Sequence, residues 1–178
     1  MDPIGLYLHV PFCAGRCPYC DFFTLRADAE KRTAYVHALE RDLISWSKEE
    51  YAFDTVYFGG GTPSVLEGQQ VAELLHVIRD HFPLAPQAEI TVECNPSSDL
   101  EAFLPPIIAA GVNRISLGLQ SAVERERRLL GRTADRKRVE EVLSLIRDLG
   151  VDNISLDVML GVPEQTADSL WETLDFCL

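Results

Sequence analysis

The chain has 178 residues, of which 47% are hydrophobic and 25% are charged, a composition typical of one globular domain with a substantial core. Its 16 Lys and Arg against 28 Asp and Glu give a formal net charge of -12, which argues against a nucleic-acid-binding surface. No apolar run approaches the roughly 20 residues that span a bilayer, and we find no signal-peptide pattern, so we expect a cytoplasmic protein.

Short runs typical of β-strands alternate with helical patterns along the chain. The strand candidates are 4–10, 54–59, 88–94, 112–119 and 151–160. Apolar residues with helical spacing predict helices packed on a core at 35–44, 71–82 and 139–149. Ser98 to Glu101 has the pattern of a capping box that opens another helix, which we expect Pro105 and Pro106 to kink or shorten.

This alternation favours an α/β fold with a parallel sheet, either doubly wound or curled into a barrel. The unusual residues follow or end the five strands in turn: the cysteine-rich segment 11–23, the turn 59–62, Glu93, Gln120 and Asp157. Because the carboxyl ends of parallel strands share one rim, this placement favours a barrel over a single switch-point crevice. We therefore predict a partial, open TIM-like barrel of about five to six parallel βα units.

The cysteine-rich segment, "PFCAGRCPYCDFF", carries Cys13, Cys17 and Cys20. In a reducing compartment such clustered cysteines are more often metal ligands or catalysts than disulfides. Three thiolates on a [4Fe-4S] cube would leave one iron open to a substrate or cofactor. Zinc is the rival interpretation, although no second Cys or His pair follows at usable spacing and His9 is the only histidine nearby. The third interpretation is that the three cysteines are free structural thiols.

The segment "CAGRCPYC" resembles the C-x3-C-x2-C motif of the radical S-adenosylmethionine (SAM) superfamily. Further blocks are similar, in order, to the oxygen-independent coproporphyrinogen III oxidase group, especially its HemW-type haem chaperone branch. These blocks are "GLYLHVPFCAGRCPYCDFF", "VYFGGGTPSVL", "EITVECNP", "RISLGLQS", "LLGRT" and "ISLDVMLGVPEQT". They all lie between about residues 4 and 174, so the resemblance covers nearly the whole chain.

The resemblance implies a [4Fe-4S] cluster on the three cysteines, with the amino and carboxylate groups of SAM on the fourth iron. It also implies a set of SAM contacts: Tyr7, Gly60, Gly61, Thr62, Glu93, Gln120, Arg132, Asp157 and Met159. Glycine at residue 61 permits a close backbone approach, so we expect Gly61→Ala to hinder SAM binding and to spare the cluster. Cys94 and Cys177 match no ligand and are interpreted as small buried hydrophobic residues.

The chemistry that the resemblance implies is one-electron. A reduced cluster passes an electron to the sulfonium of SAM, whose C5′–S bond breaks to give methionine and a 5′-deoxyadenosyl radical. The cofactors carry this chemistry, and the protein supplies orientation and a dry cavity. An electron donor such as a flavodoxin or ferredoxin is implied, together with haem or a porphyrinogen and a haemoprotein acceptor.

Two departures from the family pattern qualify these expectations. Coproporphyrinogen oxidases carry a further cysteine two residues after the third ligand, where this chain has Phe22, and this favours the haem chaperone branch. Family members also continue for roughly as many residues again. We therefore expect residues 1–178 to be an incomplete radical SAM core domain that lacks a C-terminal domain.

Three functions in different classes follow from the sequence. The leading hypothesis is a haem-binding chaperone that delivers haem to other proteins and uses the cluster and SAM for regulation or transfer. The alternative is an enzyme that oxidatively decarboxylates coproporphyrinogen III or a related substrate. A zinc-stabilised binding module is the third.

Overall fold

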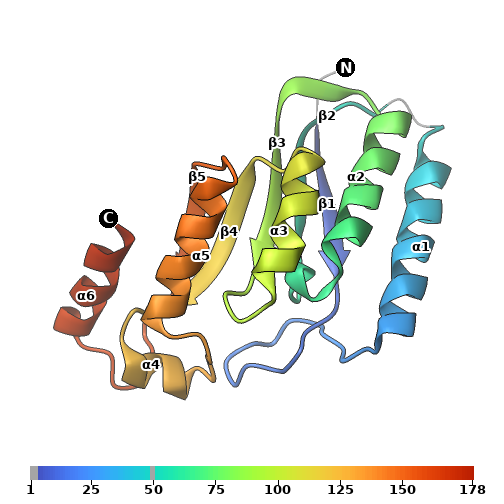
Figure 1. Ribbon diagram of the computed structural model, residues 1–178. Helices are drawn as coiled ribbons and strands as arrows, with labels where there is room; N and C mark the ends of the chain where they lie inside the picture. The colour runs from blue at the N-terminus through green and yellow to red at the C-terminus, as the bar shows by residue number, and fades with distance from the viewer. Residues whose placement is uncertain (1–3, 49–50) are drawn as a thin grey trace.

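The computed structural model describes residues 4–48 and 51–178 (Figure 1). One sheet contains five parallel strands in chain order: β1 (Ile4–Val10), β2 (Phe53–Gly60), β3 (Leu84–Cys94), β4 (Arg114–Gln120) and β5 (Asn153–Val158). The α-helices are α1 (Ala29–Trp46), α2 (Gly68–His81), α3 (Leu100–Ala109), α4 (Glu124–Leu129), α5 (Arg136–Asp148) and α6 (Ala167–Cys177). A 3₁₀ helix, η1 (Pro63–Val65), follows β2.

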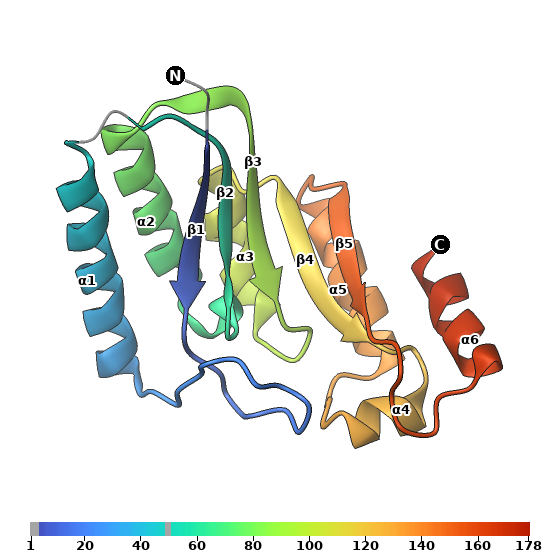
Figure 2. The ribbon, with the colours of Figure 1, turned by 180° about the vertical axis from the view of Figure 1, so that it is seen from behind.

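The long connecting helices all cover one face of the sheet. The two views show α1, α2, α3 and α5 on that face and uncovered strands on the other (Figures 1 and 2). Crossovers between neighbouring parallel strands are right-handed, so a strictly sequential strand order places every helix on the same side. A doubly wound sheet would reverse its order. The predicted α/β fold of partial, open barrel type is therefore confirmed.

The two faces of the sheet differ in chemistry because successive side chains on a strand point to opposite sides. Toward the helices the strands present buried apolar residues, which are Leu8, Val10, Val56, Phe58, Ile90, Val92, Ile115 and Leu117. The intervening positions toward the open face are polar or aromatic, namely Tyr7, His9, Tyr57, Glu93, Ser116 and Asp157. The core thus lies between sheet and helices, and the open face offers functional groups.

The start of α3 differs from the prediction. Asp99, not Ser98, is the N-cap, and its side chain accepts a hydrogen bond from the Ala102 N–H at 3.2 Å. The Ser98 hydroxyl instead bonds the Ser64 hydroxyl at 2.9 Å. The expected capping box at residues 98–101 is therefore wrong.

The two prolines do not end α3, because the helix continues through Pro105 and Pro106 to Ala109. The expected shortening is therefore wrong, and the expected kink stays a prediction. Proline removes helical hydrogen bonds, which costs stability. One side of α3 is nevertheless fully or almost fully buried against the core, through Leu100, Phe103, Leu104 and Ile107. Burial of such side chains stabilises by about 1.5–3 kcal/mol each, enough to offset the missing bonds.

The last helix, α6, is held by a buried carboxylate. Glu126 on α4 is fully buried and accepts hydrogen bonds from the hydroxyls of Ser121 at 2.8 Å and Ser169 at 2.5 Å. Ser169 and Thr173 are the buried residues of α6. The fully buried residues of this helix are therefore polar. Three apolar residues that share one face in the sequence pattern are only half-buried, namely Leu170, Leu174 and Cys177.

No helix in the described ranges 4–48 and 51–178 is long and apolar enough to cross a membrane.

Candidate functional site

A cavity of about 1010 Å³ lies at the carboxyl ends of the strands. Its wall combines the loop after β1, the turn after β2 and the ends of β3, β4 and β5, all of which meet at the edge marked by the arrowheads (Figure 2). Every predicted site residue except Tyr7 lines it: Cys13, Cys17, Cys20, Gly60, Gly61, Thr62, Glu93, Gln120, Arg132, Asp157 and Met159. The structure thus gathers residues that are far apart in the sequence.

The segment 11–25, which we call the cysteine loop, is closed at its base by backbone hydrogen bonds. The Leu25 N–H donates to the Pro11 carbonyl at 2.7 Å, and the Cys13 N–H donates to the Leu25 carbonyl at 3.1 Å. The Phe12 carbonyl accepts from the Thr62 N–H at 2.8 Å. The loop is therefore tied both to itself and to the turn after β2.

The three cysteines of this loop are free and half-buried. Cys13 Sγ lies 3.4 Å from Thr62 Oγ1, and the Cys20 N–H donates to the Cys17 carbonyl at 3.1 Å, which makes a tight turn. Among the described residues no three His, Cys, Asp or Glu side chains converge to hold a single metal ion. In a [4Fe-4S] cube each thiolate bonds a different iron atom, so the thiols need not converge on one point. The donor set fits a cube better than a mononuclear zinc site.

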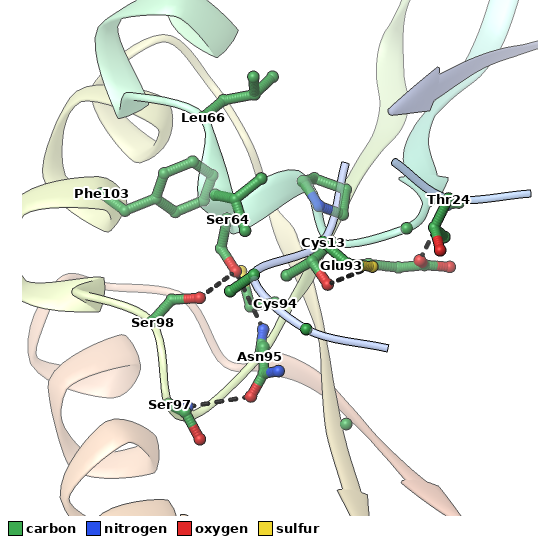
Figure 3. Close-up of a pocket in the computed structure, with 18 of the residues that line it drawn as sticks. Cys13, Thr24, Ser64, Leu66, Glu93, Cys94, Asn95, Ser97, Ser98 and Phe103 are labelled. Carbon is green, nitrogen blue, oxygen red and sulfur yellow. Dashed lines mark hydrogen bonds between the residues drawn. The ribbon is translucent and has the colours of Figure 1, made fainter. Parts of the chain in front are cut away.

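A second wall of the cavity consists of η1 and the connection from β3 to α3 (Figure 3). The Ser64 hydroxyl bonds Ser98 and accepts from the Asn95 N–H at 3.0 Å. From behind, the Arg138 guanidinium donates to the carbonyls of Pro96 at 3.1 Å and Ser98 at 3.3 Å. This wall is therefore fixed by its own hydrogen bonds.

Two carboxylates, Glu93 and Asp157, face the cavity from the sheet. Glu93 accepts hydrogen bonds from the Tyr57 hydroxyl at 2.8 Å and the Gly60 N–H at 3.2 Å. Asp157 accepts one from the Ser116 hydroxyl at 3.1 Å. Burial raises the pKa of Glu93 above its ordinary value, the two hydrogen bonds act to lower it, and the charge of Asp157 raises it. Both carboxylates are suited to accept hydrogen bonds from hydroxyl groups of a ligand.

Gln120 and Arg132 contribute hydrogen-bond donors to the same cavity. Gln120 ends β4 with φ +66°, a left-handed conformation that is unfavourable for a non-glycine residue and recurs at functional sites. The buried Arg132 Nε has no hydrogen-bond partner within the described residues. A Cβ atom on Gly118 would lie 2.7 Å from Arg132 Nη2 and 3.1 Å from Gln120 Nε2, so the two donor groups gather there. An unsatisfied buried donor in a cavity fits an anionic ligand group.

Gly61 packs closely against the backbone at the start of the cysteine loop. A Cβ atom at this position would lie 2.6 Å from the Phe12 carbonyl oxygen and 2.9 Å from the Val10 carbonyl oxygen. Both neighbours are backbone atoms that lead into the cysteine loop, and backbone moves less readily than a side chain. The expectation that an alanine here spares the loop therefore conflicts with the packing.

Tyr7 lies outside the cavity lining, on the open face of β1. Its ring stacks on the Tyr57 ring with centroids 5.9 Å apart, and the residue is 55% exposed. Sequence reasoning missed Tyr57 and Ser116, which hold the two carboxylates. A signal was present, because each of the two residues lies two positions before a glycine on the same strand face. Gly59 lies beside Glu93, and Gly118 lies beside Arg132.

The two cysteines outside the loop differ in burial. Cys94 is buried, as expected, and burial raises the pKa of its thiol, which keeps it protonated. Cys177 is only half-buried, so the expectation that it is a buried hydrophobic residue is wrong. A protonated buried thiol is a poor metal ligand, because the thiolate is the ligating form.

The sequence model of the radical SAM superfamily matches residues 7–177. Heme chaperone HemW of Mycobacterium tuberculosis (strain ATCC 25618 / H37Rv) is 39% identical over 179 residues, which cover 98% of this chain and 46% of that protein. Heme chaperone HemW of Escherichia coli (strain K12) is 37% identical over 172 residues, which cover 94% of this chain and 45% of that protein. A solved structure of coproporphyrinogen III oxidase (HemN) of Escherichia coli, a radical SAM enzyme, superposes on this chain with a TM-score of 0.88 at 30% identity. The superposition covers 97% of this chain and 41% of that chain.

The open barrel with its rim cavity and three-cysteine loop is thus that of a radical SAM protein, and the chain belongs to the radical SAM superfamily. Its sequence is similar to proteins named heme chaperone HemW, and it spans about half the length of the curated relatives it matches.

Membership of this superfamily implies SAM and a [4Fe-4S] cluster as cofactors. The residues present fit both groups. Three free thiols share one loop beside the cavity, the orphaned Arg132 Nε suits a carboxylate, and Glu93 and Asp157 suit hydroxyl groups.

Proposed function

We propose that this chain is the radical SAM core domain, residues 1–178, of a haem chaperone of the HemW type. The observation that carries the proposal is that three free cysteines and the polar ends of the strands line one cavity. The 39% identity to a protein named heme chaperone HemW supports the particular function.

In this proposal Cys13, Cys17 and Cys20 hold three corners of the [4Fe-4S] cluster and leave one iron to SAM. The proposed SAM contacts are Tyr7, Gly60, Gly61, Thr62, Glu93, Gln120, Arg132, Asp157 and Met159. When bound, the cluster and SAM supply one-electron chemistry that the side chains do not have.

The chain's own residues bind and orient SAM. Glu93 and Asp157 accept hydrogen bonds from ribose hydroxyls, and the Arg132 guanidinium binds the carboxylate. Met159 is an apolar neighbour for the adenine. The hydrogen bonds that close the cysteine loop and the second wall keep these groups in place before any ligand arrives, which lowers the ordering cost of binding.

Haem is the proposed cargo, and a haemoprotein the proposed acceptor. A one-electron donor such as a flavodoxin or ferredoxin is proposed to reduce the cluster. The proposed location is the cytoplasm, where thiols stay reduced and available to iron.

Oxidative decarboxylation of a porphyrinogen is the second candidate function, because the HemN superposition has a TM-score of 0.88. Phe22 counts against it. In the resemblance drawn from the sequence, the oxidases carry a cysteine at this position, and here an exposed phenylalanine lines the cavity.

Anaerobic reconstitution with iron and sulfide tests the cluster. We expect about four irons and four sulfides per chain, and loss of most of both in Cys17→Ala. Cys94→Ala is the matched control, because Cys94 is buried and belongs to the core beneath the sheet. Full iron content in Cys17→Ala would overturn the assignment.

Ligand measurements on the reconstituted protein distinguish the two functions. Haem binding and transfer to an apo-haemoprotein, without decarboxylation of coproporphyrinogen III, supports the chaperone. SAM-dependent decarboxylation favours the enzyme. One zinc per chain with neither iron nor sulfide retained would contradict both.

A further inference from the structure

The Glu93 carboxylate is held on both of its oxygen atoms. The Tyr57 hydroxyl donates to Oε1 at 2.8 Å from the neighbouring strand β2, and the Gly60 N–H donates to Oε2 at 3.2 Å from the end of the same strand. Tyr57 pairs with Thr91 in the sheet, so it lies one two-residue repeat below Glu93 on the open face. Its hydroxyl therefore reaches up to the carboxylate from the sheet floor.

The space for this contact is kept open by Gly59, which lies between the two side chains. A Cβ atom there would stand 2.8 Å from Tyr57 Cε1 and 2.9 Å from Glu93 Oε1. Both distances are well inside van der Waals contact. Any side chain at residue 59 would push the phenol and the carboxylate apart, so the first glycine of the Gly59-Gly60-Gly61 run serves this pair.

The phenol is also held from the other side. The Tyr57 ring stacks on the Tyr7 ring with an interplanar angle of 24°. Burial, followed by the hydrogen bond and charge of Glu93, raises the pKa of Tyr57. The hydroxyl therefore keeps its proton and acts as a donor throughout the physiological pH range.

We infer that Tyr57 is a positioning residue that sets the plane of the Glu93 carboxylate so that it can accept hydrogen bonds from two adjacent hydroxyl groups of the ligand. An ionised carboxylate has about four acceptor sites. Tyr57 and Gly60 use one on each oxygen, which leaves one on each oxygen for a vicinal diol such as that of ribose. This inference rests on the proposed SAM site and assigns to Tyr57 a role in recognising its sugar.

Binding of two ligands to the reconstituted holoprotein tests the inference. The ligands are SAM and an analogue that lacks both ribose hydroxyls, and the proteins are the parent, Tyr57→Phe and Tyr51→Phe. Tyr57→Phe retains the ring and its stacking but loses the hydroxyl. Tyr51→Phe makes the same change outside the rim cavity, beside Phe53. The dissociation constants, the iron content and the thermal midpoint are measured for each.

We expect Tyr57→Phe to bind SAM about threefold to tenfold more weakly than the parent, the usual effect of one lost hydrogen bond. It should bind the dideoxy analogue as the parent does, with unchanged iron content. Tyr51→Phe should match the parent for both ligands. In a Glu93→Ala background, adding Tyr57→Phe should cause no further loss of SAM affinity, because the group it orients is gone.

Unchanged SAM affinity in Tyr57→Phe, equal weakening for both ligands, or an additive loss in the double variant would overturn the positioning role while leaving the proposed function intact. A parent protein that binds the two ligands equally would overturn it as well, since Glu93 then recognises no diol. A parent that assembles the cluster and binds neither ligand would overturn the SAM site itself, and the positioning role with it.

Discussion

At the scale of single residues, close approaches decide the roles of Gly59, which lies in β2, and Gly61, which directly follows that strand. Gly61 faces the carbonyl oxygens of Val10 and Phe12, whereas Gly59 faces the side chains of Tyr57 and Glu93. The two glycines therefore have different roles. Gly61 permits the cysteine loop to pack on the sheet, and Gly59 permits the hydrogen bond between Tyr57 and Glu93.

Gly61→Ala is accordingly expected to lower the iron content after reconstitution and the thermal midpoint, as well as SAM affinity. Its methyl group would displace the backbone next to Cys13, which no side-chain rotation can relieve. Gly15→Ala is the control in the same loop, because a Cβ there meets only the Arg26 guanidinium at an ordinary 3.7 Å. Iron assays and thermal unfolding of both variants give the answer, and full iron content in Gly61→Ala would count against this packing argument.

At the scale of elements, Arg138 joins α5 to the start of α3. It forms a two-pronged ion pair with Glu101, with Nη1–Oε1 and Nη2–Oε2 distances of 2.5 and 2.9 Å, and it donates to the backbone of the cavity wall. The Arg138 hydrogen bonds lower the pKa of Glu101 to about 2. One arginine thus fixes both a helix contact and the wall of the site.

Glu101→Gln should lower the thermal midpoint slightly at neutral pH, because an exposed pair contributes at most about 1 kcal/mol. The depressed pKa means that the ion pair contributes fully above the ordinary value of 4.5, and that this contribution is lost as the pH falls toward about 2. The difference in thermal midpoint between the parent and Glu101→Gln should therefore become smaller as the pH falls through that range. Glu140→Gln, which breaks an Arg136 pair within α5, is the comparison. A difference that grows on acidification would refute this account.

The attachment of α6 depends on Glu126, so Glu126→Ala should release that helix. Truncation removes the charged acceptor of the buried Ser121 and Ser169 hydroxyls and leaves them only the weaker contacts to Thr173 Oγ1 and the Thr166 carbonyl. A hydrogen bond to a charged group contributes about 1.5–3 kcal/mol. We expect a lower free energy of unfolding in urea and faster proteolysis within 167–177. Glu124→Ala, on the exposed side of the same helix, should leave both unchanged. Equal protease resistance of the two variants would exclude the proposed attachment.

Strand order and the rim location of the site were predictable because they follow from local patterns. The β-rich runs identified every strand, and the helical stripes identified α1, α2 and α5. Residues after strand ends must meet at one edge of a parallel sheet. Contacts that depend on register between strands were not predictable. Tyr57 reaches Glu93, and Ser116 reaches Asp157, only because of how neighbouring strands align. The polar packing of α6 was missed because its partner, Glu126, lies far away in the sequence.

At the scale of the whole molecule, the sheet has two edges and one open face. Within the part of the chain that the structure describes, β1 and β5 each pair on one side only, and β5 carries no fully buried residue. Thr91 and Val92 of β3, in contrast, pair with both β2 and β4 and are buried. Unequal protection of the backbone should follow, since hydrogen bonds at an edge open more readily than those at a centre.

Amide hydrogen exchange should therefore be slow at Thr91 and Val92 of β3 and markedly faster in β5. The measurement is exchange followed by mass spectrometry under native conditions, with α2, whose apolar side is fully buried, as the internal reference for slow exchange. Protection of β5 equal to that of β3 would mean that this edge is covered in solution, for example by self-association through the strand.

The sequential strand order also bears on how the protein is made. Each strand pairs with the one synthesised just before it, so the sheet can grow from β1 while the chain emerges from the ribosome. The cysteine loop follows the first strand and Asp157 lies in the fifth, so synthesis separates them by on the order of ten seconds. During that interval the three free thiols lack the walls that later enclose them. Iron delivered early would meet only the loop, and the ligand cavity exists only after the last strand has joined the sheet.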